Sequence, residues 1–534
     1  MNAKKFNRRD FLRLSAVTAA GAALAACKAQ TPEVVQQTVI VQGTPQVVTT
    51  TPQVVQQTVI VQGTPQVVTA TPPPKVITLV VGAYYPTEWT ERSADHPQVT
   101  NAPRILAEKY KDVEPNIEIK WLRYTSPEGT TDTYTAAWYD ALAAAGNMPD
   151  VTALYHEIPI LKGYAMPIED YLKQPNPYAP EFETWYDSFY PSIMNALKYP
   201  NGHIYCAPVQ DKITGFEVGM FVNMDWFKKI GMEPPKTWTE QKAVCKALKE
   251  AGSSVIPWPP ESKEGNIWAL GLQLLPSMLQ PEAAKMDTNG DLFVGAPEAL
   301  VAFRNGLVGP LTPKYKKGWQ EQKLIVDYWP QGWASADLEA LWRNGEVGMR
   351  QSGAWEVTAQ MSDPQITFER KFIPPASVTS EDLSEANDPP EWTKGDGTVP
   401  EGALVMINGP DQGVSMATKE RGTTDAAIKW LQWTTAPEND AFIVNENQEL
   451  VPTVRTAPLG TVWKELLSYP MPKYKYAIAW WGECLQFDNT LFNETRKLFV
   501  AWATGQMDDA TFFKRQQEET IAGANRYEAA VSTP

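Results

Sequence analysis

The sequence contains little histidine, little cysteine and few charged side chains. Of its 534 residues, 3 are His, 4 are Cys and 20% are Asp, Glu, Lys or Arg. So few histidines disfavour a His-rich metal site, and the absence of G-x-S-x-G, H-E-x-x-H and Walker sequences leaves nucleophilic, zinc and nucleotide chemistry without support. Acidic residues outnumber basic ones by 62 to 47, which disfavours a nucleic-acid partner because phosphate binding needs a basic surface. We therefore expect no metal, no cofactor and no nucleic acid.

The chain is nevertheless long and rich in apolar side chains. Hydrophobic residues make up 43% of it and aromatic residues 11%, which excludes a wholly disordered protein. Single hydrophobic cores stop growing at about 250 to 300 residues, so 534 residues predict more than one folded unit.

The first 27 residues have the pattern of a bacterial export signal. Arg8 and Arg9 lie in a basic start that resembles the twin-arginine signal, and an uncharged run of 13 residues follows over 14–26. A membrane-spanning helix needs about 20 residues, so this run is interpreted as the apolar region of a signal peptide. The tetrapeptide at 24–27 (LAAC) resembles a lipobox, which predicts cleavage after residue 26 and lipid on Cys27. The alternative is a cytosolic protein with an Arg-Arg pair by chance.

A sequence repeat follows the signal. Residues 31–50 recur at 51–70 with two differences. Repeat folds need about three units to bury a continuous face, and Val and Thr with regularly placed Pro favour extended backbone. We therefore predict that residues 27–74 are a lipidated N-terminus and a linker. The strand character of VVQQTVIV leaves a small β-element packed on the body as the alternative.

Strand and helix patterns alternate from residue 75 onwards. Buried-type strands are predicted at 76–81, 116–122 and 151–155, with helical patterns at 104–110 and 134–142 between them. This alternation indicates an α/β fold with a parallel sheet, whose ligands are expected beyond the carboxyl ends of the strands. Further helices are predicted at 338–342, 426–433, 498–502 and from 509 on, and after a capping box formed by Thr237 and Glu240, with Gly252 at its end.

Several segments occur in the order found in one known family. Residues 199–205 (YPNGHIY), 221–231 (FVNMDWFKKIG) and 234–238 (PPKTW) resemble the central signature of extracellular solute-binding proteins that serve ABC importers, and 341–349 (LWRNGEVGM) and 413–417 (GVSMA) follow in the same order. The branch that this chain most resembles is the sugar-binding, maltose-binding-protein-like one. That resemblance implies a two-lobed periplasmic-binding-protein-like fold of type II, with a ligand cleft between lobes joined by a hinge.

The resemblance also implies that each lobe is assembled from two stretches of chain. One lobe would comprise residues 75–212 plus about 412–458, and the other about 213–411 plus 459–534. Crossings between the lobes would lie near 207–214, 409–413 and 459–476.

Aromatic and polar residues that follow predicted strands are the candidate ligand contacts. Pyranose rings pack on aromatic faces and their hydroxyls need directed polar partners, which 20 Trp and 20 Tyr and nearby polar groups can supply. The alternatives are a loop-capping role for the polar residues at 156–157 and a simple ion pair at 211–212. The candidates after the first and third strands, at the first crossing, and in segments that match cleft-lining aromatics of the family are Tyr84, Tyr85, Trp89, Tyr155, His156, Glu157, Asp211, Lys212, Trp355, Trp480 and Trp481.

Other tryptophans and the cysteines receive separate interpretations. Helical spacing predicts core positions for four tryptophans, Trp138, Trp226, Trp430 and Trp502. Two tryptophans in a predicted loop are open to ligand stacking instead, Trp329 and Trp333. With Cys27 assigned to lipid, one disulfide plus a thiol and three buried thiols both stay open for Cys206, Cys245 and Cys484.

One acidic segment resembles a calcium loop only superficially. Residues 287–291 (DTNGD) place glycine fourth instead of sixth and lack a glutamate at the twelfth position. We interpret this segment as a hairpin turn.

These patterns together predict a lipid-anchored extracytoplasmic binding protein, at the bacterial cell surface or in the periplasm, and not an enzyme. It would capture a carbohydrate and deliver it to the permease subunits of an ABC transporter. The alternatives are a binding protein for a peptide, polyamine or osmolyte, and an exported glycoside hydrolase with paired carboxylates.

Overall fold

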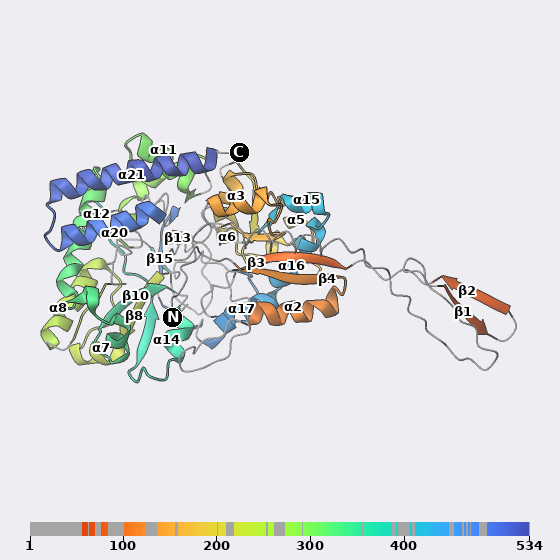
Figure 1. Cartoon of the computed structure of the whole chain (residues 1–534). Helices are drawn as coiled ribbons and strands as arrows, with labels where there is room; N and C mark the ends of the chain where they lie inside the picture. The colour runs from red at the N-terminus through yellow and green to blue at the C-terminus, as the bar shows by residue number, and fades with distance from the viewer. Residues whose placement is uncertain are drawn as a thin grey trace, which may run out of the picture. The chain divides into compact units, whose positions relative to one another are not determined.

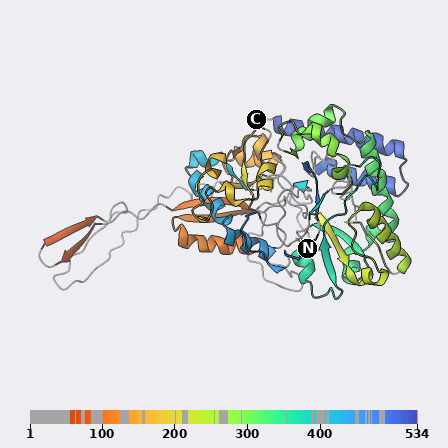
Figure 2. The same ribbon diagram turned by 180° about the vertical axis from the view of Figure 1, so that it is seen from behind.

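The chain divides into two units, residues 1–75 and 76–534. The computed structural model (Figures 1 and 2) describes these residues of them: 56–61, 64–69, 76–83, 101–123, 136–154, 158–199, 201–209, 218–252, 255–260, 273–290, 292–353, 356–386, 391–393, 406–407, 412–447, 453–461, 464–465, 468–469, 471–479 and 489–532.

The described part of the first unit is a β-hairpin in the second copy of the repeat. Strand β1 (Gln56–Val61) pairs antiparallel with β2 (Thr64–Thr69), so that Ile60 lies opposite Pro65. In a two-stranded hairpin every second N–H points away from the partner strand, and proline is tolerated at such a position because it removes no ladder hydrogen bond. The strand character predicted for VVQQTVIV is thus present at residues 56–61, while the role of residues 27–74 as a linker stays a prediction.

A six-stranded sheet begins the second unit. Strand β3 (Ile77–Ala83) pairs in parallel with β4 (Ile117–Arg123) and with β5 (Val151–Ala153). Helices α2 (Ala102–Val113) and α3 (Ala136–Ala144) lie between these strands in sequence, and α2 is beside the orange strands in Figure 1. The alternating strand and helix pattern predicted for residues 76–155 is confirmed.

The rest of this sheet comes from residues far apart in sequence. Strand β14 (Gln412–Ser415) lies antiparallel between β5 and β6 (Ala165–Met166), and β7 (Cys206–Ala207) also pairs with it. Gly413 is needed here because a Cβ atom would lie 2.6 Å from the carbonyl oxygen of Tyr205. One short strand from beyond residue 400 thus closes the sheet formed by residues 77–207.

Three smaller sheets follow in the second unit. In the first, the central strand β8 (Val218–Asn223) pairs antiparallel with β10 (Met349–Gly353) and β11 (Arg370–Ile373). In the second sheet, β16 (Ala477–Ala479) pairs in parallel with β13 (Met406–Ile407) and with β9 (Phe293–Val294). In the third sheet, β12 (Glu391–Thr393) pairs antiparallel with β15 (Met471–Lys473).

Helix α8 (Trp238–Ala251) begins with the predicted capping box. The Thr237 side chain accepts a hydrogen bond from the Glu240 backbone N–H, and the Glu240 carboxylate accepts one from the Thr237 N–H. The remaining helices are α4 (Ile158–Leu161), α5 (Glu169–Leu172), η2 (Tyr186–Ser188), α6 (Pro191–Ala196), α7 (Met224–Ile230), α9 (Leu275–Met278), α10 (Gln280–Met286), α11 (Ala296–Arg304), α12 (Pro313–Leu324), η4 (Ile325–Tyr328), η5 (Trp333–Ser335), α13 (Leu338–Arg343), α14 (Val357–Ser362), α15 (Ala417–Arg421), α16 (Thr424–Thr434), α17 (Pro437–Asn447), α20 (Asn489–Ala503) and α21 (Asp509–Ser532).

Buried tryptophans organise the packing of these helices. Trp430 of α16 packs edge-on against Tyr110 of α2, and Trp502 of α20 stacks on Phe512 of α21 with ring centroids 4.2 Å apart. Both tryptophans are buried, as predicted, and Figures 1 and 2 show α20 and α21 side by side. Trp138 and Trp226 are only half-buried, so their core assignment is correct in part.

Two expectations from the sequence are wrong. Trp329, expected in a loop open to ligand stacking, is buried and packs edge-on against Trp333 and against Phe499 of α20. The segment 287–290 is a turn but not a hairpin, because it connects α10 to β9 and β9 pairs in parallel with β16.

The buried cysteine of α8 is a free thiol. Cys245 is 1% exposed, and burial raises the pKa of its thiol. Cys206 is buried in β7, and Cys484 lies outside the described residues.

Candidate functional site

Three strands of the six-stranded sheet end at one edge. Strands β3 and β5 are parallel, and β7 runs in the direction of β5 because both are antiparallel to β14. Gln412, the first residue of β14, pairs with Ala153 and Ala207, the last residues of β5 and β7. The segments that leave β3, β5 and β7 therefore start from the same edge, where ligands bind in sheets of this kind.

The predicted contacts in the first half of the chain follow these strand ends directly. Tyr84 and Tyr85 come immediately after β3, the segment 155–157 begins two residues after β5, and 211–212 begins four residues after β7. These residues and Trp89 lie outside the described residues, as does Cys27. Their roles in ligand binding and lipid attachment stay predictions.

The predicted contacts in the second half also follow strand ends. Gly353, the last residue of β10, pairs with Val218, the first residue of β8, so Trp355 follows the edge at which the chain enters this sheet. Trp480 and Trp481 follow β16, whose last residue pairs with the last residue of β13. All three tryptophans lie outside the described residues.

A short connection joins the edges of two sheets. The chain passes from Ile407 at the end of β13 to Gln412 at the start of β14, five residues later. An extended chain covers at most about 3.6 Å per residue, so these two positions are within about 18 Å of each other. Ile407 neighbours Ala479, the residue before Trp480, so the strand end that leads to Trp480 lies beside the start of this connection.

Gln412 is a polar residue at this edge that the sequence interpretation did not select. Its side chain is 4% exposed and it stands between the ends of β5 and β7. A buried carboxamide at strand ends offers both a donor and an acceptor. Its place in the crossing predicted near 409–413 was the available signal, but only the strand register shows that it lies between the ends of β5 and β7.

An ionic network fixes the chain just after Trp355. Glu356 precedes α14, and its carboxylate contacts Arg350 at 2.7 Å and accepts a hydrogen bond from the Gln360 amide at 3.2 Å. Arg350 also pairs with Glu339 at 3.0 Å. These contacts join α13, β10 and α14. The strand before the 354–355 segment and the helix after it are therefore held together, as is expected of residues that support a binding site.

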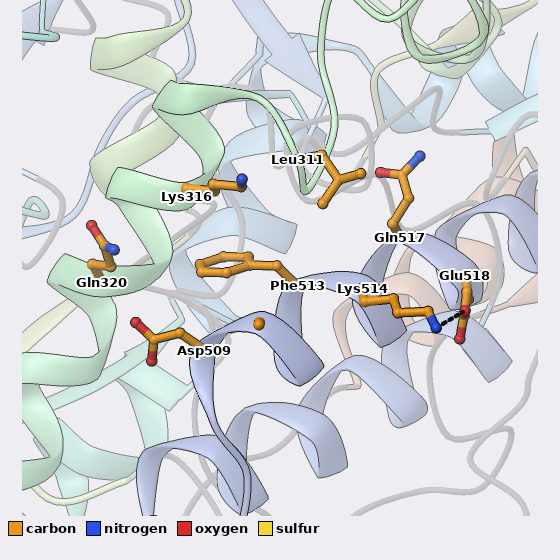
Figure 3. A pocket seen from close by; sticks show the side chains of 9 residues that line it. Leu311, Lys316, Gln320, Asp509, Phe513, Lys514, Gln517 and Glu518 are labelled. Atoms are coloured by element: carbon orange, nitrogen blue, oxygen red, sulfur yellow. Dashed lines mark ion pairs between the residues drawn. The ribbon is translucent and has the colours of Figure 1, made fainter.

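A groove away from these strand ends lies between two helices of the second unit. A groove of about 590 Å³ separates α12 from α21, with Leu311 and Phe513 between the two helices (Figure 3). Lys316 and Gln320 line it from α12, and an ion pair between Lys514 and Glu518 lies on α21. No strand end contributes to its lining, so this groove is distinct from the candidate site.

The described residues offer neither a cluster of metal ligands nor a membrane-spanning helix. Those residues contain no group of three or more His, Cys, Asp and Glu side chains placed to hold a metal ion. Within the same part of the chain, no helix combines the length and apolar character needed to cross a membrane.

Comparison with protein families identifies the chain. The family model for bacterial extracellular solute-binding proteins matches residues 106–470, which is more than half of the chain. This chain belongs to the family of bacterial extracellular solute-binding proteins. A second model, for the twin-arginine translocation signal, matches residues 5–25, so the solute-binding protein carries an export signal. The family resemblance and the Tat signal inferred from the sequence are thus both confirmed.

Solved structures similar to this solute-binding protein share its α/β fold. A sugar transporter protein from Bacillus licheniformis in complex with stachyose is 16% identical, with a TM-score of 0.52 over 84% of this chain and 100% of that one. A cyclic maltosyl-maltose binding protein from Arthrobacter globiformis is 14% identical, with a TM-score of 0.53 over 85% and 100%. A chitin oligosaccharide binding protein is 17% identical, with a TM-score of 0.55 over 84% and 99%. The predicted type II fold is confirmed, and a comparison with curated protein sequences found no match.

Proposed function

We propose that this solute-binding protein captures a sugar or oligosaccharide outside the cytoplasm and delivers it to the permease subunits of an ABC transporter. The sheet edges that carry the predicted aromatic and polar contacts support this proposal, because they are joined by the short connection from Ile407 to Gln412. A ligand bound between them would touch aromatic residues from one sheet and polar residues from the other. Similar folds have been solved with stachyose and raffinose bound, which favours a carbohydrate.

The proposed arrangement has two lobes and no catalytic role. Residues 75–212 and about 412–458 would form one lobe around the six-stranded sheet, and about 213–411 and 459–534 the other. Closure of the lobes around the ligand would create the form that the permease recognises, by differential affinity for the closed and open states. Because a receptor returns its ligand unchanged, recovery of intact sugar separates it from a glycoside hydrolase.

We further propose that lipid on Cys27 holds the protein at the outer face of the cell membrane. Acyl chains contribute about 0.8 kcal/mol per buried methylene, enough to retain an acidic protein that the membrane surface would not attract. A Cys27→Ser variant should move from the membrane fraction to the soluble fraction, and an unmodified Cys27 in the mature wild-type protein would contradict this.

The direct test of ligand binding is a thermal-shift screen of the purified protein. Raffinose, stachyose, maltose and chitin oligosaccharides are compared with amino acids, peptides, polyamines and betaine. A ligand at 100 times its dissociation constant stabilises the folded state by about 2.7 kcal/mol, which is readily visible in a melting curve. Stabilisation by sugars alone is the expected result, whereas stabilisation only by peptides, amines or betaine would overturn the carbohydrate assignment.

A further inference from the structure

The segment after residue 452 begins bound to the six-stranded sheet. The Thr453 hydroxyl donates to the carbonyl oxygen of Pro208, just beyond β7, at 2.6 Å. Val454 forms an antiparallel bridge with Phe189, and both are buried. The same segment later becomes β15 and β16, which belong to other sheets. It is therefore a passage of chain from one sheet region to another.

The side-chain carboxamide of Asn445 hydrogen-bonds to the backbone in the first part of this passage. Asn445 of α17 donates from Nδ2 to the Pro458 carbonyl oxygen at 2.8 Å, and its Oδ1 accepts from the Gly460 N–H at 2.7 Å. A Cβ atom on Gly460 would lie 2.9 Å from that oxygen, so a larger residue there would displace the Asn445 side chain. One side chain thus satisfies both a donor and an acceptor of the passing backbone.

A second carboxamide holds the other end. Gln280 of α10 donates from Nε2 to the Tyr476 carbonyl oxygen at 2.9 Å, and its Oε1 accepts from the Tyr476 N–H at 3.0 Å. Two residues earlier, the Tyr474 hydroxyl hydrogen-bonds to Ser277 of α9 at 2.6 Å. The N–H and C=O of one residue are the pair that a neighbouring antiparallel strand engages, so Gln280 takes the place of a strand partner immediately before β16.

We propose that Asn445 and Gln280 are positioning residues that fix the two ends of this passage between the lobes. The inference rests on the proposed function, in which the six-stranded sheet and β16 belong to different lobes. Asn445 then ties Gly460 to one lobe, and Gln280 ties Tyr476 to the other. Because β16 ends one residue before Trp480, Gln280 also fixes the strand that leads to the predicted stacking residues.

Hydrogen exchange of the ligand-free protein tests the hydrogen bonds of Asn445 and of Gln280 to the backbone without requiring a sugar. In the wild type, the amides of Gly460 and Tyr476 should exchange slowly. Gln280→Met removes both hydrogen bonds to Tyr476, together with the one that Nε2 donates to the Pro276 carbonyl oxygen at 3.0 Å, at nearly constant volume. It should speed exchange at Tyr476 about tenfold or more while leaving Gly460 unchanged. Asn445→Ala should show the reverse pattern. Gln280→Glu keeps the acceptor but turns a carboxylate oxygen towards the carbonyl oxygens of Tyr476 and Pro276, so it too should speed exchange at Tyr476.

The control variant is Gln174→Met. The Gln174 amide is exposed and bonds only to the Asp170 carbonyl oxygen nearby, at 3.1 Å, so neither reporter amide should change. Unchanged exchange at Tyr476 in a folded Gln280→Met protein would overturn the inference. So would equal acceleration of Gly460 and Tyr476 in each variant, because that pattern means general loosening. If Gln280→Met does not fold, fast exchange of the Tyr476 amide in the wild type overturns the inference.

A binding measurement then separates positioning from stability. With raffinose and stachyose as probes, Gln280→Met should raise the dissociation constant at least about threefold under conditions in which its melting curve shows the variant to be fully folded. An unchanged dissociation constant in a variant with lost protection would overturn the link between Gln280 and the ligand segment. If the wild type binds none of the sugars of the thermal-shift screen, the proposed carbohydrate function fails, while the exchange experiment still decides whether Asn445 and Gln280 hold the backbone at Gly460 and Tyr476.

Discussion

Replacement of Asp150 should destabilise the protein strongly, because this carboxylate joins three separate segments. One oxygen accepts from the Val80 backbone N–H of β3 at 2.7 Å, and the other accepts from the Thr423 hydroxyl at 2.5 Å and pairs with Arg421 at 3.1 Å. Asp150 is 1% exposed. It therefore links the start of β5 to β3 and to the turn between α15 and α16.

The size of the effect follows from these contacts. Hydrogen bonds to charged groups contribute about 1.5 to 3 kcal/mol, and breaking a buried ion pair by removing one partner costs about 3 to 5 kcal/mol. Arg421 is 33% exposed and can regain water, which limits the loss. We expect about 3 to 4 kcal/mol for Asp150→Ala. Asp150→Asn should cost about 2 kcal/mol, because the amide keeps one acceptor but turns an N–H₂ group towards a donor.

Urea unfolding followed by tryptophan fluorescence measures the loss in free energy of unfolding. That loss is the shift of the urea midpoint multiplied by the m-value, which is the slope of the free energy of unfolding against urea concentration. The matched control is Asp170→Asn, which removes an exposed ion pair with Lys173 in the same region and should leave the midpoint unchanged. If Asp150→Ala unfolded at the same urea concentration as the control, the account of Asp150 as a link between segments would be refuted.

Four further predictions follow from local chemistry. Burial alone would raise the pKa of Asp140, but its hydrogen bonds, chiefly from Lys162, hold that pKa below the usual range. The stability that the Asp140 carboxylate contributes is therefore present above about pH 4 and is lost as the pH falls through the folded-state pKa. Asp140→Asn should lower the urea midpoint most at pH 7 and least near pH 2. Thr237→Ala removes half of the capping box and should cost about 1 kcal/mol in the same assay, and a neutral result would contradict the cap. Cys245 should react with iodoacetamide only after unfolding, as mass spectrometry of its peptide would report, because its buried thiol has a raised pKa. Trp355→Ala should weaken sugar binding at least tenfold without changing the melting temperature of the free protein, and unchanged affinity would remove Trp355 from the site.

Local patterns in the sequence were sufficient to predict the first part of the fold. The alternation of buried strand and amphipathic helix over residues 76–155 predicts the parallel strands β3, β4 and β5, because each pattern reflects which face of a single element is buried. The capping box at Thr237 was equally predictable, since its two hydrogen bonds involve residues three positions apart.

Pairing between distant segments was not predictable in this way. The four residues of β14 complete a sheet whose other strands precede residue 210, and nothing in QGVS specifies those partners. Trp329 shows the same limit for side chains. Its local sequence predicts a loop, whereas its burial depends on Phe499, 170 positions later in α20.

The candidate site contains residues that the sequence was sufficient to select and one residue that it was not. Residues such as Tyr84 and Tyr155 could be selected because they follow predicted strands, and the structure brings those strand ends to one edge. Gln412 could not be selected, because its place at that edge depends on the register between β14 and two other strands. Position along the chain thus indicates which loops carry the site, and register decides which buried polar residues accompany them.

The most direct test of the central claim is isothermal titration calorimetry of the purified protein with raffinose, stachyose and chitin oligosaccharides, with analysis of the recovered ligand. The account predicts saturable binding of at least one of these sugars at one site per chain, and recovery of the sugar intact. Absence of binding to every carbohydrate together with saturable binding of a peptide, polyamine or betaine would contradict it, as would recovery of cleaved sugar.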